Sequence, residues 1–185
     1  MGQITLSTKY DKGKEQLYVH RIVQYFAKAF DEAPMITDAD GSERCSDDYK
    51  VFGFKGIPPS TVAAFLTSSL FYWYWRRHGD GFHCGYADIL KCPMPTLPPE
   101  AHVRLRQVQE ALAQNLAQTS KRKTIKSKQG FVTYREYYPA SSKPIMDQAD
   151  AVLAQAIGLS AEQADWVLNF EIKYRLGDLQ EEAEA

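Results

Sequence analysis

The sequence has no long apolar run. Its 185 residues contain no stretch of about 18 apolar residues, which argues against a membrane-spanning helix. The first residues also lack the apolar core of a secretory signal peptide. Three cysteines, at positions 45, 84 and 92, are an odd number for a disulfide framework. We therefore expect reduced thiols, a cytoplasmic location and no membrane partner.

Patterns for several kinds of chemistry are also missing. A structural zinc site needs four ligands, but His83, Cys84 and Cys92 supply one adjacent pair and one distant residue. Ser68–Ser69 lacks the Gly-x-Ser-x-Gly turn that exposes a nucleophile. The acids of 31–48 show no compact pattern for Mg²⁺, which makes a small nuclease the weakest functional hypothesis. We expect no metal site and no catalytic residue.

The formal net charge of −1 conceals three charged blocks. Residues 101–140 contain eight Lys or Arg and two acids, whereas residues 31–48 contain seven acids and one Arg. Residues 178–185 add four acids and no base. The basic block suits a phosphate backbone, and the acidic blocks suit solvent or a partner surface.

Residues 64–95 carry the most informative pattern. Five consecutive aromatics (71–75) precede the basic pair Arg76–Arg77, a turn from Gly79 to His83 and a Pro-punctuated exit at 92–95. This order resembles the C-terminal target-recognition region of adenine-specific DNA methyltransferases from bacterial restriction–modification and phage-exclusion systems. Further segments similar to that family, in its order, are 18–34, 46–55, 142–147 and 169–175.

The resemblance implies a DNA-reading region without its catalytic part. Family enzymes need an Asn/Asp-Pro-Pro-aromatic motif for the flipped adenine. Neither Pro58–Pro59 nor Pro98–Pro99 has the polar and aromatic neighbours. The turn 52–56 could be a cofactor loop, but a strand end is the plainer interpretation. We expect no methylation by the isolated chain and no cofactor in it, with S-adenosylmethionine bound only in a separate catalytic domain.

We expect an α+β fold, in which a small mixed or antiparallel sheet packs on a buried aromatic helix that three further helices follow. Four segments divide the chain: a flexible arm (1–16), a target-recognition core (17–97), a helical support (98–177) and an acidic tail (178–185). Strands are expected within 17–26, where a helix competes, and over 49–54; residues 31–48 read as a loop and 86–90 as a short strand or turn. Expected helices cover 60–78, 98–118, 143–157 and 160–175, and a basic loop or hairpin covers 119–138.

Two groups of residues are the candidates for binding double-stranded DNA. The basic segment would neutralise phosphates, although a solvated loop is the plainer alternative. The end of the aromatic helix and the following turn would read base edges, although arginines there could equally stabilise the helix terminus. The candidates are Arg76, Arg77, His83, Lys91, Lys121, Arg122, Lys123, Lys126, Lys128, Tyr134 and Arg135. A rival hypothesis is a module that docks on a separate methyltransferase subunit without DNA affinity of its own.

Overall fold

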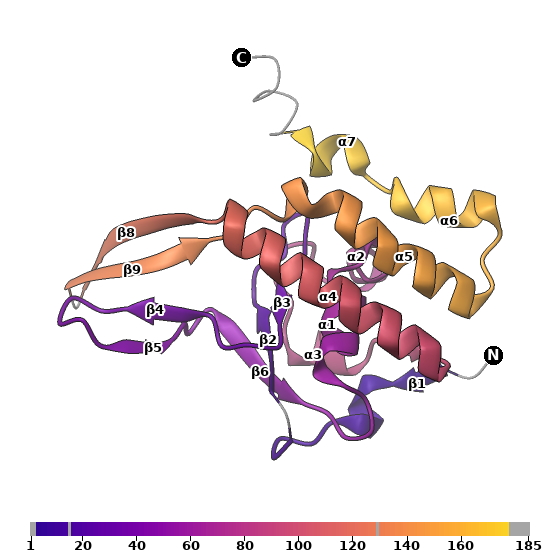
Figure 1. Cartoon of the computed structure of the whole chain (residues 1–185), viewed down its shortest axis with the longest axis horizontal. Helices are drawn as coiled ribbons and strands as arrows, with labels where there is room; N and C mark the ends of the chain where they lie inside the picture. Colours follow the sequence, from indigo (N-terminus) through magenta and orange to yellow (C-terminus); the bar gives the residue numbers. More distant parts are fainter. Residues whose placement is uncertain (1–2, 15, 129, 178–185) are drawn as a thin grey trace.

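The computed structural model describes residues 3–14, 16–128 and 130–177 of the chain. It confirms the α+β class, with small antiparallel sheets packed against helices (Figure 1). The acidic segment 178–185 lies outside the described residues. No helix in the described part of the chain is long and apolar enough to cross a membrane.

The strands form three antiparallel sheets in the described residues. One pairs β1 (Gln3–Thr5) with β7 (Pro93–Pro95). The second has the order β3 (Ala29–Phe30), β2 (Gln16–His20), β6 (Tyr49–Gly53). The third has the order β5 (Glu43–Cys45), β4 (Met35–Thr37), β9 (Gly130–Glu136), β8 (Lys121–Ser127). The expected loop at 31–48 thus contains a hairpin, because Asp38 to Ser42 closes a turn between β4 and β5.

The helices differ from the expected ones mainly at their ends. They are α1 (Pro59–Thr67), α2 (Ser69–His78), α3 (Tyr86–Leu90), α4 (Pro99–Thr119), α5 (Lys143–Ile157), α6 (Ala161–Leu168) and α7 (Ile172–Arg175). Short 3₁₀ helices occupy Leu6–Lys9 (η1) and Pro139–Ser142 (η2). More helices therefore follow the aromatic segment than the three expected, because 86–90 is helical and the segment 160–175 is interrupted after Leu168.

The expected helix 60–78 is divided at Ser68. This residue has an extended backbone (φ −70°, ψ 158°), and its hydroxyl oxygen accepts a hydrogen bond from the Phe71 amide at 3.1 Å. The buried Asp150 carboxylate accepts from the amides of Ser69 and Leu70, both at 3.1 Å. These acceptors satisfy amides that a new helix start leaves without intrahelical partners, so the chain can begin α2 here at a new angle.

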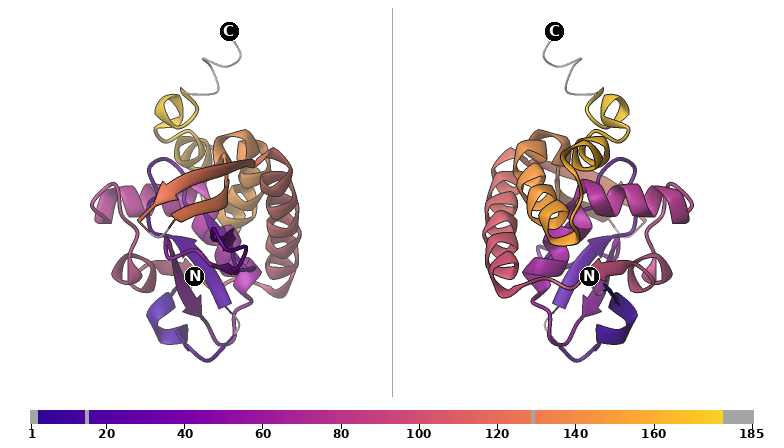
Figure 2. Two further views of the ribbon diagram at one scale, coloured as in Figure 1. Left: turned by 90° about the vertical axis from the view of Figure 1, so that its left-hand side faces the viewer. Right: turned by 90° about the vertical axis from the view of Figure 1, so that its right-hand side faces the viewer.

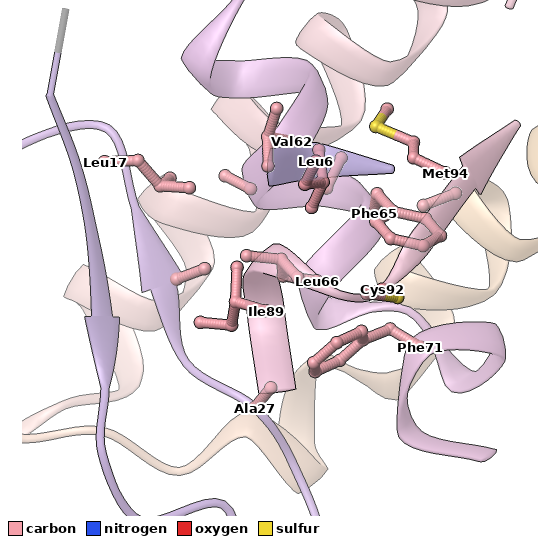
Figure 3. Packing of buried hydrophobic residues seen from close by; sticks show 14 of the residues in the cluster. Leu6, Leu17, Ala27, Val62, Phe65, Leu66, Phe71, Ile89, Cys92 and Met94 are labelled. Carbon is pink, nitrogen blue, oxygen red and sulfur yellow. The ribbon is translucent and has the colours of Figure 1, made fainter. Parts of the chain in front are cut away.

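The core surrounds α1, whose residues from Ser60 to Thr67 are all buried. Side chains from β2, α1, α2, α3 and β7 meet there (Figure 3). Leu17 and Val19 point into this core while their neighbours in β2 are partly exposed, which is the alternation expected of a strand with one buried face. The aromatic residues Phe71, Tyr72 and Trp75 are buried on α2, as the sequence led us to expect.

Residues 3–14 do not form the flexible arm that was expected over 1–16. The strand β1 pairs with β7, and the Leu6 side chain is completely buried in the core. The Asp11 amide donates to the Gly53 carbonyl at 2.8 Å, so close that a β-carbon on Gly53 would collide with the Asp11 backbone. The expectation was wrong because it rested on the polar composition of this segment, whereas its few apolar residues pack into the core.

Two hairpins extend together from the helical body, β4–β5 and β8–β9 (Figure 1). The two join through the Thr37–Thr133 pairing of β4 with β9, which leaves β8 at the edge of the sheet. Viewed from the hairpin end, α4 lies on one side of the molecule and α2 on the other (Figure 2).

Candidate nucleic-acid interface

The basic segment 119–138 is a regular two-stranded ribbon, β8–β9. Seven residue pairs run from Lys121–Glu136 at its base to Ser127–Gly130 near its tip. Because paired residues share a face of a sheet and neighbours alternate, the register sorts the side chains into two faces. We call them the outer face (Arg122, Thr124, Lys126, Phe131, Thr133, Arg135) and the inner face (Lys121, Lys123, Ile125, Val132, Tyr134, Glu136).

The outer face combines positive charge with exposed apolar surface. Arg122 and Lys126 are exposed and form no ion pair with any described residue, and the same is true of Lys128 in the turn. Phe131, opposite Lys126, is 58% exposed and adds apolar surface to this face. Arg135 instead donates to the Ser120 hydroxyl at 3.2 Å and stays close to the end of α4. The outer face carries no acidic side chain.

The inner face carries a counter-charge that the sequence block did not suggest. Glu136 lies across the strands from Lys121 and forms an ion pair with Lys123 (Nζ to Oε2, 2.5 Å) and a hydrogen bond with Tyr138. The Lys123 ammonium is the main cause of the lowered pKa of Glu136. Tyr134 is half-buried and, with Ile125 and Val132, lines an open cleft of about 540 Å³ between the ribbon and residues of β2, β4 and β5.

The pleat of the ribbon therefore divides the predicted phosphate-binding cluster. Arg122, Lys126 and Lys128 form no ion pair within the described residues, whereas Lys123 is neutralised by Glu136. Lys121 lies over the Tyr138 ring, with 5.2 Å from its nitrogen to the ring centre.

The acidic segment lies beside the ribbon in the same sheet. Arg44 neutralises two of its carboxylates, Asp38 at 2.8 Å and Asp47 at 2.9 Å. Asp40 and Glu43, by contrast, are exposed and have no ion pair within the described ranges. A polyanion would be repelled on this side and attracted at the β8 edge, so the charge pattern gives the sheet one favoured direction of approach.

Several hydrogen bonds hold the predicted base-reading turn in place. Asp80 Oδ1 accepts from the amides of Phe82 (2.8 Å) and His83 (2.6 Å), and Asp80 Oδ2 lies 2.9 Å from His83 Nδ1. Gly81 has a φ of +80°, and a β-carbon there would strike the Arg76 guanidinium. The Trp75 indole donates to the His83 carbonyl at 3.0 Å, which holds the turn on α2.

The turn is also bonded to the segment that borders the cleft. The Val23 amide donates to the Phe82 carbonyl at 3.1 Å, and the Cys84 amide donates to the Arg21 carbonyl at 2.8 Å. Ile22 pairs with His83 in an isolated bridge and lines the cleft beneath the ribbon. The exposed His83 ring and the inner face of the ribbon are thus connected through one short segment.

The hydrogen bonds to Asp80 make its pKa a test of this turn. The Phe82 amide, the His83 ring and the His83 amide lower the pKa of Asp80 from 3.8 to about 2. Because the folded-state pKa is depressed, the contribution of this carboxylate to stability is present above about pH 3.8 and is lost as the pH falls through about 2. An NMR titration of the Asp80 carboxyl should give this value; a pKa near 3.8 would show that the turn does not form in solution.

Arg76, Arg77 and Lys91 occupy different environments. The Arg76 Nε atom lies 3.2 Å from Glu171 Oε2, which also accepts from the Tyr72 hydroxyl at 2.7 Å. Arg77 is exposed and forms no ion pair among the residues described. Lys91 is exposed after α3 and borders a small cavity with Tyr74 and His78. Arg76 therefore connects α2 to the C-terminal segment, and Arg77 is the more available of the pair.

Alanine substitutions should separate the two arginines. Arg76→Ala removes a partly exposed ion pair and should lower the free energy of unfolding by up to about 1 kcal/mol, whereas Arg77→Ala should change it by less than about 0.5 kcal/mol. Thermal denaturation of both variants measures this contrast. Equal melting temperatures would mean that the contact between Arg76 and Glu171 contributes nothing to stability.

A buried polar network links three of the family-like segments, and the sequence did not indicate it. The Arg175 guanidinium is 4.5 Å from the ring centres of both Phe26 and Tyr72. It donates to the Ser69 hydroxyl and to the Tyr25 carbonyl, each at 3.2 Å. In the sequence, the one trace of this network is that Arg175 stands in one family-like segment and its contacts Ser69 and Tyr72 stand in another.

Asp150 and Glu171 complete this network. Asp150 binds the start of α2, and among nearby charges its carboxylate does most to favour the charged form of Arg175. Glu171 binds Tyr72 and Arg76 from a left-handed backbone conformation (φ 54°), which is strained for a non-glycine residue. The network holds α2, α5 and α7 together.

The cysteines are unsuited to metal binding. Cys84 and Cys92 are completely buried, and burial raises the pKa of Cys84 to about 12 and that of Cys92 as well, which keeps both thiols protonated. The described residues contain no group of three or more His, Cys, Asp or Glu that could hold a metal ion.

No family model matches the chain, and searches of curated proteins and of solved structures likewise find no match.

Proposed function

We propose that this chain binds double-stranded DNA through the β8–β9 ribbon, as the cytoplasmic target-recognition part of an adenine-specific restriction–modification methyltransferase. The observation that carries the proposal is the outer face of the ribbon and its turn. Arg122, Lys126 and Lys128 lie there without an ion pair to an acidic residue of the described chain, and Phe131 is exposed opposite Lys126.

The dimensions of the ribbon suit a major groove. Seven residues per strand extend for about 20 Å, and a major groove about 12 Å wide admits a two-stranded ribbon. Arginine can form two hydrogen bonds to a guanine edge, and lysine can neutralise a phosphate. Arg122 and Lys126 supply these two chemistries on one face, and Thr124 and Thr133, hydrogen-bonded to each other at 2.9 Å, lie between them.

This proposal moves base reading away from the end of α2. The Nε atom of Arg76 is bound to Glu171, so a guanine contact from this arginine would have only its terminal N–H groups to use. Arg77 and His83 are exposed and remain candidates for contacts beside the ribbon, as does Lys91. In this proposal the methyl donor binds a separate catalytic domain, since the motifs for adenine and cofactor binding are missing from the sequence.

The alternative proposal is a module that docks on a methyltransferase subunit without DNA affinity of its own. The exposed aromatics of the C-terminal segment favour it. Trp166 on α6 is 53% exposed and Tyr174 on α7 is 64% exposed, and such side chains are enriched in protein interfaces.

A titration of a labelled DNA duplex with the protein, at several salt concentrations, distinguishes these proposals. DNA binding through the ribbon predicts an affinity that falls steeply with salt, by about 0.9 log units per log unit of salt for each phosphate contacted. The absence of binding at about 50 mM salt would contradict the first proposal and favour the docking module. Cleavage of the duplex on addition of Mg²⁺ would instead indicate a nuclease.

A further inference from the structure

A second cleft lies at the base of the ribbon, where α4 ends and β8 begins. Its volume is about 570 Å³, and its walls include residues 23–26, Lys28, Lys121 and the segment 136–141. It shares Lys28 and Glu136 with the cleft beneath the inner face, so Lys28 lies between the two. We refer to it as the root cleft.

The root cleft has an excess of positive charge. The charged side chains in its walls are Lys28, Lys121 and Arg175 against Glu136. Glu136 is already neutralised by Lys123, and Arg175 is held by Ser69, Tyr25 and two aromatic rings. Lys28 and Lys121 are therefore the cations with unused capacity.

Lys28 is the more buried of these two lysines. Its side chain is half-buried, yet its ammonium forms no hydrogen bond and no ion pair with the described residues. Burial is the main cause of its lowered pKa, and Glu136 and Asp48 offset it only in part. Burial of an ammonium group without a close partner lowers the free energy of unfolding. Destabilising arrangements of this kind are typical of ligand-binding sites in the absence of ligand.

The turn beside Lys28 adds a second observation. Gln24 borders both clefts and has a φ of +50°, in the left-handed region that non-glycine residues rarely adopt. Strained backbone of this kind gathers at ligand-binding positions. The strained turn and the unpartnered lysine thus meet at the same opening.

We propose that the root cleft binds a phosphate group, with Lys28 and Lys121 as its ligands, and that this phosphate belongs to the backbone of the DNA held by the ribbon. The inference rests on the proposed DNA binding for the source of the phosphate. Lys121 begins β8, the edge strand of the sheet, and belongs to the inner face, so a duplex on the outer face would reach the cleft by passing around the β8 edge. A phosphate held there fixes the register of the ribbon on the duplex, because backbone contacts position a protein while base contacts specify the sequence.

The test compares Lys28→Met with Lys28→Arg and with Lys50→Met, a matched change at another half-buried lysine. Lys28→Met should weaken duplex binding about tenfold and lower the salt slope by about 0.9, because a charged hydrogen bond and one phosphate contact are lost. Lys28→Arg should retain the slope, and Lys50→Met should match the unaltered protein. Lys28→Met should also melt no lower than the unaltered protein, because its buried charge is gone. An unchanged slope in Lys28→Met would overturn the assignment.

A second arm uses inorganic phosphate alone and follows the melting temperature. Phosphate should raise it for the unaltered chain and for Lys50→Met, but not for Lys28→Met. If the unaltered chain fails to bind DNA yet shows this Lys28-dependent shift, the phosphate site stands and its DNA source is overturned. If neither the shift nor the salt slope depends on Lys28, the phosphate site itself is refuted.

Discussion

Arg175→Ala should lower the free energy of unfolding by about 3–5 kcal/mol, the largest stability loss that we expect from one substitution in this chain. The side chain is only 3% exposed and lies between Phe26 and Tyr72. Its loss removes hydrogen bonds to the Ser69 hydroxyl and the Tyr25 carbonyl. It also deprives the buried Asp150 carboxylate of a nearby positive charge. Chemical denaturation, analysed with the linear dependence on denaturant, measures the loss.

Two further variants show whether the loss comes from this network. Lys173→Ala removes an exposed cation two residues away and should change stability by less than about 0.5 kcal/mol. Arg175→Lys keeps the charge but loses the planar guanidinium that lies between the rings, so most of the destabilisation should remain. A loss below about 1 kcal/mol for Arg175→Ala would mean that the network forms without contributing to stability.

The same network explains what the family-like motifs could and could not reveal. The order of segments correctly predicted an α+β fold around a buried aromatic helix. It could not show that Ser69, Asp150 and Arg175, which are 81 and 25 residues apart along the chain, meet in the core. Pairing of that kind depends on tertiary contacts, and periodicity within a single segment does not contain it. Ser69, Asp150 and Arg175 are all buried, so these three residues stabilise the fold and do not face solvent.

The basic segment shows a similar limit at the candidate site. The sequence shows the positive charge of this segment and its position after a long predicted helix. A hairpin was one of the two structures expected there, the other being a loop. The division into two faces depends on the register of β8 with β9, which places Glu136 beside Lys123 and leaves Arg122 and Lys126 outward. A shift of one residue would exchange the two faces, so composition alone could not assign them.

Replacement of the outer cations Arg122, Lys126 and Lys128 by glutamine should lower the salt slope of DNA binding by about 1.8 if the two lysines contact one phosphate each. Affinity should fall for every duplex sequence through the lost phosphate contacts. The single variant Arg122→Gln should in addition weaken binding to a preferred site by about 1–3 kcal/mol if this arginine contacts a guanine. Fluorescence anisotropy across a salt series, with random and selected duplexes, measures both effects.

The control carries the same charge change outside the ribbon, at the exposed residues Lys12, Lys14 and Lys55. If the ribbon is the contact element, this triple variant should keep nearly the whole slope, since general attraction depends on net charge but counterion release depends on contact. The three replaced side chains on the ribbon are exposed and have no ion pair within the described chain, so both variants should melt like the unaltered protein. Equal slopes for the two variants would assign DNA binding to the overall charge, and base reading would then have to be sought at Arg77, His83 and Lys91.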